Sequence, residues 1–231
     1  MQIKKNDFIE IEFTGKSNNE IFDTTNPEEA KSIGLDVDVK PTIVSVGNEM
    51  LLKGLDEALE GKEIDKKYSV HLAPNKAFGK RDSKLIRTIP IRVFHEKEMN
   101  PVPGMVFQLD NRLVRILSVS GGRVIADFNN PLAGKDVDYD FKVLRIVDDI
   151  KDKINAIQDF FFRQRFEFSV DEANKKIIFK ESKIKPIIDV FSNKFKTLSG
   201  FDAEVEEKKP EKKEKAEEKS PVHDENCKHE H

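Results

Sequence analysis

Apolar and charged residues alternate through residues 3–13, and this period of two predicts a β-strand with one buried face. Ser17-Asn18-Asn19 predicts a turn, and the strand pattern resumes at Ile21-Phe22. Residues 26–40 are mostly polar and include a proline and a glycine, which is typical of a surface excursion. The first forty residues therefore predict a hairpin that is followed by a surface segment.

The segment 42–61 predicts a strand, a break and a short helix. Residues 42–46 alternate like a half-buried strand, which Gly47-Asn48 ends. The helix that follows carries its apolar residues on one face and ends at Gly61. It contains no nucleophile and no base. We therefore expect it to place large apolar side chains beside the free N–H groups of a helix start, which suits binding of a peptide carbonyl.

A second pattern begins after Gly79. Residues 89–98 predict a short helix with Pro90 at its start. Two-residue turns then separate three short apolar runs, which predicts a small antiparallel sheet over residues 104–109, 112–119 and 123–128. Residues 138–147 predict a final strand that returns to the first part of the chain.

The C-terminal part has helical apolar spacing over 150–161 and 186–198, with strand-like runs at 166–179 and 201–205. So many phenylalanines exceed what a unit of this size comfortably buries alone. Two alternatives remain open, namely packing on the preceding domain and self-association. We predict a homodimer through this unit.

Composition narrows the function classes. A net charge of −3 gives little electrostatic support for nucleic-acid binding, so we expect no nucleic-acid partner. No apolar run approaches the length of a membrane span, and the charged start of the chain does not resemble a signal peptide. A single cysteine cannot form an internal disulfide. We expect a cytoplasmic protein with no membrane association.

Four segments, in their order and spacing, carry a family resemblance. They are Glu12-Phe13-Thr14-Gly15, Ile21-Phe22-Asp23-Thr24, the run from Gly47 to Gly61, and Ala77-Phe78-Gly79. Together they resemble the FKBP-type peptidyl-prolyl cis/trans isomerases, and in particular the SlyD-like branch that has a domain inserted in the flap.

The resemblance implies an α+β fold, in which an antiparallel sheet wraps on a short helix. We expect the discontinuous isomerase domain at residues 1–84 and 130–148 and the inserted antiparallel β domain, the insert, at 85–129. An α/β unit, the C-terminal unit, is expected at 149–206, and a charged tail that is disordered or a solvated helix at 207–231.

The resemblance also implies roles for single residues. Asp23, Phe22, Phe78 and Phe141 are the expected catalytic residues, and Phe13, Leu51, Leu52 and Leu55 the expected substrate-binding residues. The backbone N–H of Leu52 is expected to hold a substrate carbonyl. Phe13 and Phe78 stand where family members commonly have tyrosine, and Leu55 replaces an aromatic residue. Isomerisation needs mainly an apolar cavity, so these departures weaken the case for macrolide binding more than the case for activity.

In SlyD-like proteins the insert binds unfolded chains, and here we expect that surface at Val102, Met105, Val106, Phe107 and Leu109. The alternative is that these residues form the core of the small sheet. His223, Cys227, His229 and His231 cluster in the tail and suit Ni²⁺ or Zn²⁺, although a solvated terminus explains them as well. No cofactor is required for the isomerisation.

The function expected from these features is prolyl isomerisation in unfolded or nascent, proline-containing polypeptides, with chaperone activity from the insert. One alternative is a folding chaperone whose isomerase pocket is weak or vestigial. Another is a metal-delivery protein that uses the tail.

Overall fold

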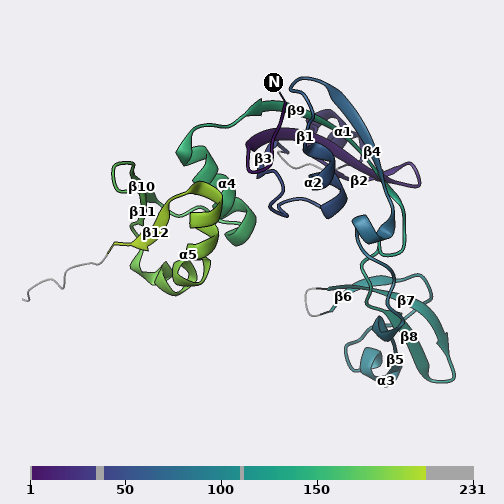
Figure 1. Cartoon of the computed structure of the whole chain (residues 1–231). Coiled ribbons are helices and arrows are strands. Elements are labelled where there is room, and N and C mark those ends of the chain that lie inside the picture. Colours follow the sequence, from purple (N-terminus) through teal and green to yellow (C-terminus); the bar gives the residue numbers. More distant parts are fainter. Residues whose placement is uncertain (1, 35–38, 110–111, 207–231) are drawn as a thin grey trace, which may run out of the picture.

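The computed structural model describes residues 2–34, 39–109 and 112–206. Three sheets divide this part of the chain into a central body, the insert and the C-terminal unit, which flank the body on different sides (Figure 1). Two of the sheets are wholly antiparallel, the third has one parallel pair, and helices pack beside them, so the α+β class is confirmed. None of the helices in the described ranges has the length and apolar character needed to cross a membrane.

The central sheet has five antiparallel strands. They are β1 (Phe8–Ser17), β2 (Glu20–Thr24), β3 (Thr42–Ser45), β4 (Lys67–Leu72) and β9 (Val137–Ile146). The order is β2-β1-β9-β4, and β3 pairs with β1 beyond the point where β2 ends. Since β9 lies between β1 and β4, the strand that follows the insert joins these two strands into one sheet.

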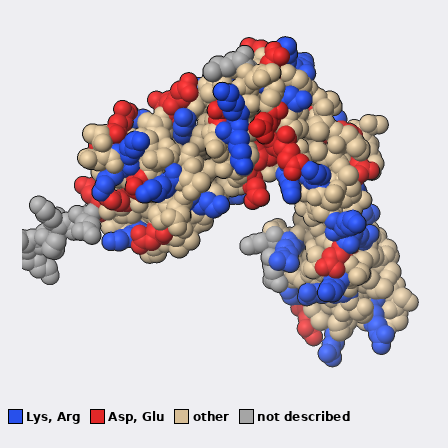
Figure 2. All heavy atoms as spheres, viewed as in Figure 1, with Lys and Arg blue, Asp and Glu red and all other residues tan. Residues whose placement is uncertain are grey.

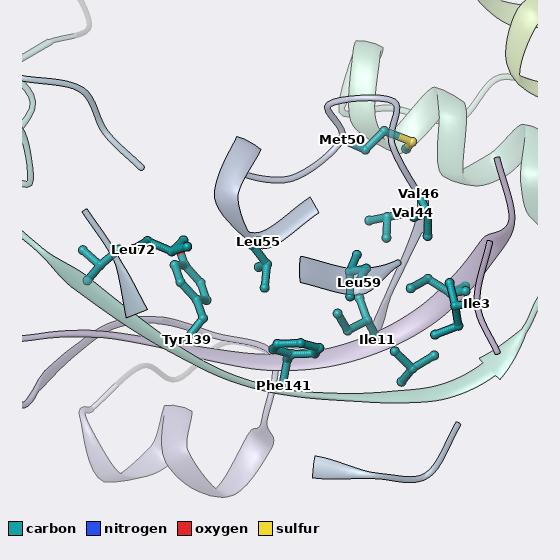
Figure 3. Packing of buried hydrophobic residues seen from close by; sticks show 13 residues of the cluster. Ile3, Ile11, Val44, Val46, Met50, Leu55, Leu59, Leu72, Tyr139 and Phe141 are labelled. Atoms are coloured by element: carbon teal, nitrogen blue, oxygen red, sulfur yellow. The ribbon is translucent and has the colours of Figure 1, made fainter. Parts of the chain in front are cut away.

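Alternation along β1 and β9 gives the central sheet one apolar face. Ile11 is fully buried on this face, beneath Leu55 and Leu59 of helix α2 (Lys53–Leu59) (Figure 3), and its strand partner Val143 is fully buried as well. The sheet curves around this short helix, so the residues that line the rim belong to several elements. Short 3₁₀ turns at Pro74–Lys76 and Ser83–Leu85 lead from the body to the insert.

The segment 26–40, predicted as a surface excursion, contains a helix. Helix α1 (Pro27–Ser32) begins after Asn26, whose side-chain oxygen accepts hydrogen bonds from the backbone N–H groups of Glu28 at 2.9 Å and Glu29 at 3.4 Å. Proline at the first helical position fits this start. Only Ala30 of this helix is buried, so apolar periodicity could not reveal it.

The insert is a four-stranded antiparallel sheet with one short helix. It consists of β5 (Ile86–Pro90), α3 (Arg92–His95), β6 (Val106–Leu109), β7 (Arg112–Ser120) and β8 (Arg123–Asp127), in the strand order β5-β8-β7-β6. Phe94 of α3 packs with Ile116 and Val124 in its core. The prediction of a helix over 89–98 was wrong at its start, because residues 86–90 pair with β8 as a strand.

The C-terminal unit packs two helices on a three-stranded sheet. Its elements are α4 (Ile150–Phe162), β10 (Phe168–Asp171), β11 (Lys176–Phe179), a 3₁₀ turn at Ser182–Ile184, α5 (Lys185–Ser199) and β12 (Asp202–Val205). Strands β10 and β11 are antiparallel, whereas β11 and β12 are parallel. Gly200 ends α5 with φ 77°, a left-handed conformation that glycine adopts without strain.

The core of the C-terminal unit extends onto the central body. Phe8 of β1, Ile43 of β3 and Val147 belong to the same apolar cluster as Ile154 and Phe179. Part of the apolar surplus predicted from the sequence is therefore buried against the preceding domain. Phe160, Ile187 and Val190 remain 41%, 41% and 75% exposed.

Candidate functional site

All eight residues expected to form the isomerase site lie on or beside the apolar face of the central sheet. Seven of them belong to one apolar cluster, in which Leu55 and Phe141 are buried while Phe13, Phe22, Leu51, Leu52 and Phe78 are partly exposed. Asp23 lies at the edge of this cluster and is exposed. The cluster thus has a buried floor and a more open rim, as a site for a proline ring requires.

Aromatic rings on this face pack in two groups. The ring of Phe22 meets Phe78 edge-on, with centroids 5.6 Å apart and an interplanar angle of 79°. It meets Tyr139 in the same manner at 5.8 Å and 86°. Across the face, Tyr68 stacks on Phe141 at 5.6 Å and 28°. Edge-to-face pairs of this kind fix ring orientation as well as burying apolar area.

Gly15 makes the close packing of these rings possible. It pairs with Asp23 on β2 and with Tyr139 on β9, and a bulge at this point leaves Phe22 as the extra residue of β2. A Cβ atom on Gly15 would lie 2.7 Å from Cζ of Phe22 and 2.9 Å from two ring atoms of Tyr139. Only glycine leaves room for both rings above this strand.

Asp23 is the acidic group of the rim. Desolvation by the surrounding protein raises the pKa of its carboxyl group, and a hydrogen bond from the backbone of Thr24 partly offsets this effect. A carboxylate in this position repels an approaching carbonyl oxygen unless a donor lies beside it.

The loop between β3 and α2 positions Leu51 and Leu52. The buried carboxylate of Asp56 accepts hydrogen bonds from the backbone N–H groups of Gly47 at 2.8 Å and Glu49 at 2.9 Å, which closes the loop. Leu52 is the N-cap residue of α2, and its N–H makes no hydrogen bond within the described ranges. This N–H is therefore available to a ligand beside the apolar cluster.

Gly54 brings α2 against the segment that carries Phe78. A Cβ atom on Gly54 would lie 2.5 Å from Cδ2 of Leu72 and 2.9 Å from the carbonyl oxygen of Lys76. The helix start and the Phe78 segment thus approach more closely than any larger residue allows.

Tyr139, Tyr68 and Asp56 belong to the site but were not expected there. Tyr139 could have been identified, since it precedes Phe141 by two residues on one strand and must share its face. No sequence pattern identifies Asp56, because its hydrogen-bond partners come together only when the loop before α2 folds.

A hollow of about 430 Å³ lies on the opposite face of the central sheet. Its polar lining includes Glu12, Lys67, Asp140 and Lys142, which alternate along their strands with Phe13, Tyr68 and Phe141, and Glu29 of α1; these three aromatic residues also border the hollow. The many charged groups of this hollow suit a proline ring less well than the apolar face does.

The insert places its expected chain-binding residues on different surfaces. Met105 and Phe107 pack against the insert's own core, with Phe107 edge-on to Phe94 at 5.6 Å. Val102 and Val106 are 51% and 54% exposed, and Leu109 is half-buried. Met105 and Phe107 thus follow the alternative of a core role, whereas Val102 and Val106 are exposed as expected.

The tail residues His223, Cys227, His229 and His231 lie outside the described residues. Within the described ranges, no group of three or more His, Cys, Asp or Glu residues is arranged to hold a metal ion.

Comparison with known proteins gives matches over both the body and the insert. Residues 1–92 match the family of FKBP-type peptidyl-prolyl cis-trans isomerases, and residues 87–132 match the IF domain of FKBP26. A short-type peptidyl-prolyl cis-trans isomerase of Methanocaldococcus jannaschii is 31% identical over 144 residues, which are 61% of this chain and 92% of that protein.

Two bacterial relatives extend this result. An FKBP-type 16 kDa peptidyl-prolyl cis-trans isomerase of Escherichia coli is 28% identical over 148 residues, or 62% of this chain and 93% of the relative. The SlyD isomerase of Aeromonas hydrophila is 32% identical over 122 residues, which are 52% of this chain and 57% of the relative. With the apolar site and the inserted sheet, these matches show that the chain belongs to the FKBP-type peptidyl-prolyl cis-trans isomerases and is a member with SlyD-like architecture.

Proposed function

We propose that this isomerase acts on X–Pro bonds of unfolded or nascent polypeptides, which it first captures on the insert. The observation that carries the proposal is an exposed apolar face of the inserted sheet, which adjoins the segments connecting the insert to the isomerase body. The two steps use different surfaces and are separable by experiment.

The chemical step needs no covalent intermediate. Rotation about an amide bond has a barrier of about 18–20 kcal/mol, because resonance must be broken. The twisted transition state loses part of the charge separation of the planar amide, so an apolar site favours it relative to the ground state that water solvates well. Lowering the barrier by about 7 kcal/mol accelerates rotation on the order of 10⁵-fold.

In this proposal the proline ring enters between Phe22, Phe78 and Phe141, above Leu55. The free N–H of Leu52 binds a substrate carbonyl at the helix start. Asp23 acts at the rim, where its carboxylate orients the groups around the rotating carbonyl. These roles fit the burial of the floor and the partial exposure of the rim.

The capture surface that we propose is the open face of the inserted sheet. Val106, Leu113, Leu117 and Ile125 are 54%, 53%, 37% and 38% exposed. Leu113 and Leu117 alternate with Val114 and Ile116, which are fully buried on the other face. Isolated exposed apolar residues are common, whereas four on one small sheet are typical of a binding surface.

A groove joins this surface to the connecting segments. It has a volume of about 240 Å³, and its lining includes Val106, Leu113, Leu117, Arg115 and Pro131. Arg81, which precedes the insert, pairs with Asp127 at the end of β8 and holds the groove wall in place. Basic side chains gather on the visible face of the insert, so acidic residues beside an apolar client segment are expected to favour binding (Figure 2).

The test is a comparison of two substrates. The double substitution Leu113→Ser with Leu117→Ser removes roughly 1–2 kcal/mol of apolar contact with a bound chain, and so lowers kcat/KM on a proline-limited refolding protein by on the order of 10-fold. On a proline tetrapeptide the double variant is expected to match the wild type. Ile33→Ser, at an exposed apolar position at the end of α1, is the matched control and is expected to leave both values unchanged. Equal losses on both substrates contradict capture on this face.

We further propose that the C-terminal unit binds a second copy of the chain. Phe160 and Phe161 on α4 and Ile187, Val190 and Phe191 on α5 form one exposed or half-exposed apolar patch, in which the Phe161 and Phe191 rings lie 5.1 Å apart. Two capture surfaces in one dimer raise avidity for a long client. Val190→Asp is expected to convert a dimer into a monomer in light scattering, and a wild-type monomer at tens of micromolar contradicts this proposal.

A further inference from the structure

Tyr139 is a nearly buried side chain whose hydroxyl group has no hydrogen-bond partner among the described residues. The residue is 3% exposed, and its hydroxyl forms no hydrogen bond within the described ranges. The chain has one other tyrosine, Tyr68, whose hydroxyl accepts a hydrogen bond from the backbone N–H of Glu63 at 3.1 Å. The Tyr139 hydroxyl is therefore free to donate a hydrogen bond to a ligand.

The surroundings of Tyr139 direct this hydroxyl toward the isomerase site. Its ring lies above Gly15, edge-on to Phe22 at 5.8 Å and tilted against Phe13 at 5.8 Å. In Figure 3 the ring rises from β9 between Leu72 and Leu55, on the side of α2. Every one of these neighbours belongs to the apolar cluster of the site or to the strand beneath it.

The hydroxyl is not sealed inside the protein. Among the described residues, Nε2 of Gln158 is the one side-chain nitrogen or oxygen that is both cut off from solvent and unpartnered. The Tyr139 hydroxyl therefore keeps a small accessible area. Because rings of the site surround it, a molecule bound there is well placed to reach this area.

We propose that the Tyr139 hydroxyl donates a hydrogen bond to the carbonyl oxygen of the X–Pro bond when a substrate is bound. The amide nitrogen of proline carries no hydrogen, so the reacting bond offers an acceptor but no donor. Phe13 and Phe78 are phenylalanines and supply no hydroxyl to the same group of rings. The donor comes instead from β9, a strand that lies across the sheet from Asp23.

Electrostatics in the free protein agrees with a donor role. Burial raises the pKa of the Tyr139 hydroxyl, and the negative charge of Asp23 raises it further, so the group stays protonated at neutral pH. The positions of the two residues explain the coupling, since both pair with Gly15 from opposite sides. A donor beside Asp23 offsets the repulsion between its carboxylate and the substrate oxygen.

This inference rests on the apolar cluster being the isomerase site, and its test separates the two claims. Tyr139→Phe keeps the ring and removes only the donor. A neutral hydrogen bond contributes about 0.5–1.5 kcal/mol, so kcat/KM on a proline tetrapeptide is expected to fall roughly 3–10-fold. The melting temperature is expected to stay the same or rise slightly, because no internal hydrogen bond is lost.

A peptide with sulfur in place of the X–Pro carbonyl oxygen distinguishes a hydrogen bond to the substrate from a purely structural role of Tyr139. Sulfur is a weak acceptor, so the wild type is expected to lose most of its advantage over Tyr139→Phe on this peptide, after correction for the uncatalysed rates. Equal losses on the oxygen and sulfur peptides, or full activity of Tyr139→Phe, overturn the inference. A wild type that is active on the oxygen peptide leaves the isomerase assignment intact in either case.

Discussion

Removal of the Asp56 carboxylate is expected to disturb the site without touching any residue that contacts substrate. Asp56 holds the loop before α2 through two backbone N–H groups, at 2.8 and 2.9 Å. Each hydrogen bond to a charged acceptor contributes about 1.5–3 kcal/mol. Water reaches part of this loop and recovers some of the loss, so Asp56→Ala is expected to destabilise the protein by about 2–4 kcal/mol. For a domain of about 100 residues this lowers Tm by roughly 10–20 °C.

The activity of Asp56→Ala is measured well below its Tm, with a coupled proline-tetrapeptide assay at 10 °C. A relaxed loop displaces Leu51 and the Leu52 N–H, and misplacement by about 1 Å costs up to about 100-fold in rate. We expect kcat/KM to fall at least about 10-fold. Glu57→Ala is the matched control, because Glu57 is the next residue of the same helix and its carboxylate makes a solvent-exposed pair with Lys76, which contributes little to stability. If Asp56→Ala loses less than about 1 kcal/mol, or keeps wild-type kcat/KM, then the loop does not position the site.

Three further outcomes are expected. Gly15→Ala forces the Phe22 and Tyr139 rings apart, so we expect the free energy of unfolding in urea to fall by about 1–3 kcal/mol and kcat/KM to fall as well. Unchanged activity would contradict the role of this glycine. The raised pKa of Asp23 means that the folded state loses stability as the pH rises above the ordinary value of 3.8, so Asp23→Asn is expected to be more stable than the wild type at pH 7. This difference in unfolding free energy is expected to disappear below pH 3.8. A difference that does not change with pH would contradict the desolvation of the Asp23 carboxylate. Phe8→Ala leaves a cavity in the core shared with the C-terminal unit and is expected to lower the free energy of unfolding by about 3–5 kcal/mol. An unchanged melting temperature would contradict this contact.

Local patterns in the sequence were sufficient for most of the strands, whereas the candidate site residues were proposed from the family resemblance. Strand β1 and helix α2 show in the sequence as an alternating run and as a helix bounded by glycines. These patterns indicate which residues of each element, such as Phe13 and Leu55, belong to its apolar face. Helix α1 was missed because it buries a single alanine, although Asn26 and Pro27 form a recognisable start. Strand β5 was missed because its strand conformation depends on pairing with β8.

The remaining features depend on contacts between distant parts of the chain. Which face of the insert is open depends on the position of Phe94, which covers Met105 and Phe107 and leaves Val106 and Leu113 exposed. A shift of one residue along a strand exchanges the two faces, so composition alone could not decide between them. The free hydroxyl of Tyr139 likewise depends on glycine at the neighbouring position of β1.

The central claim is that X–Pro bonds rotate on the face of the central sheet that carries α2. The most direct measurement is a titration of the isotope-labelled protein with a proline tetrapeptide, followed by amide chemical shifts in NMR. We predict the largest changes at Gly15, Leu52 and Phe78, and small changes at Ser69 and Lys142, which line the charged hollow on the opposite face. The reverse pattern, with the largest changes at Ser69 and Lys142, would contradict the claim.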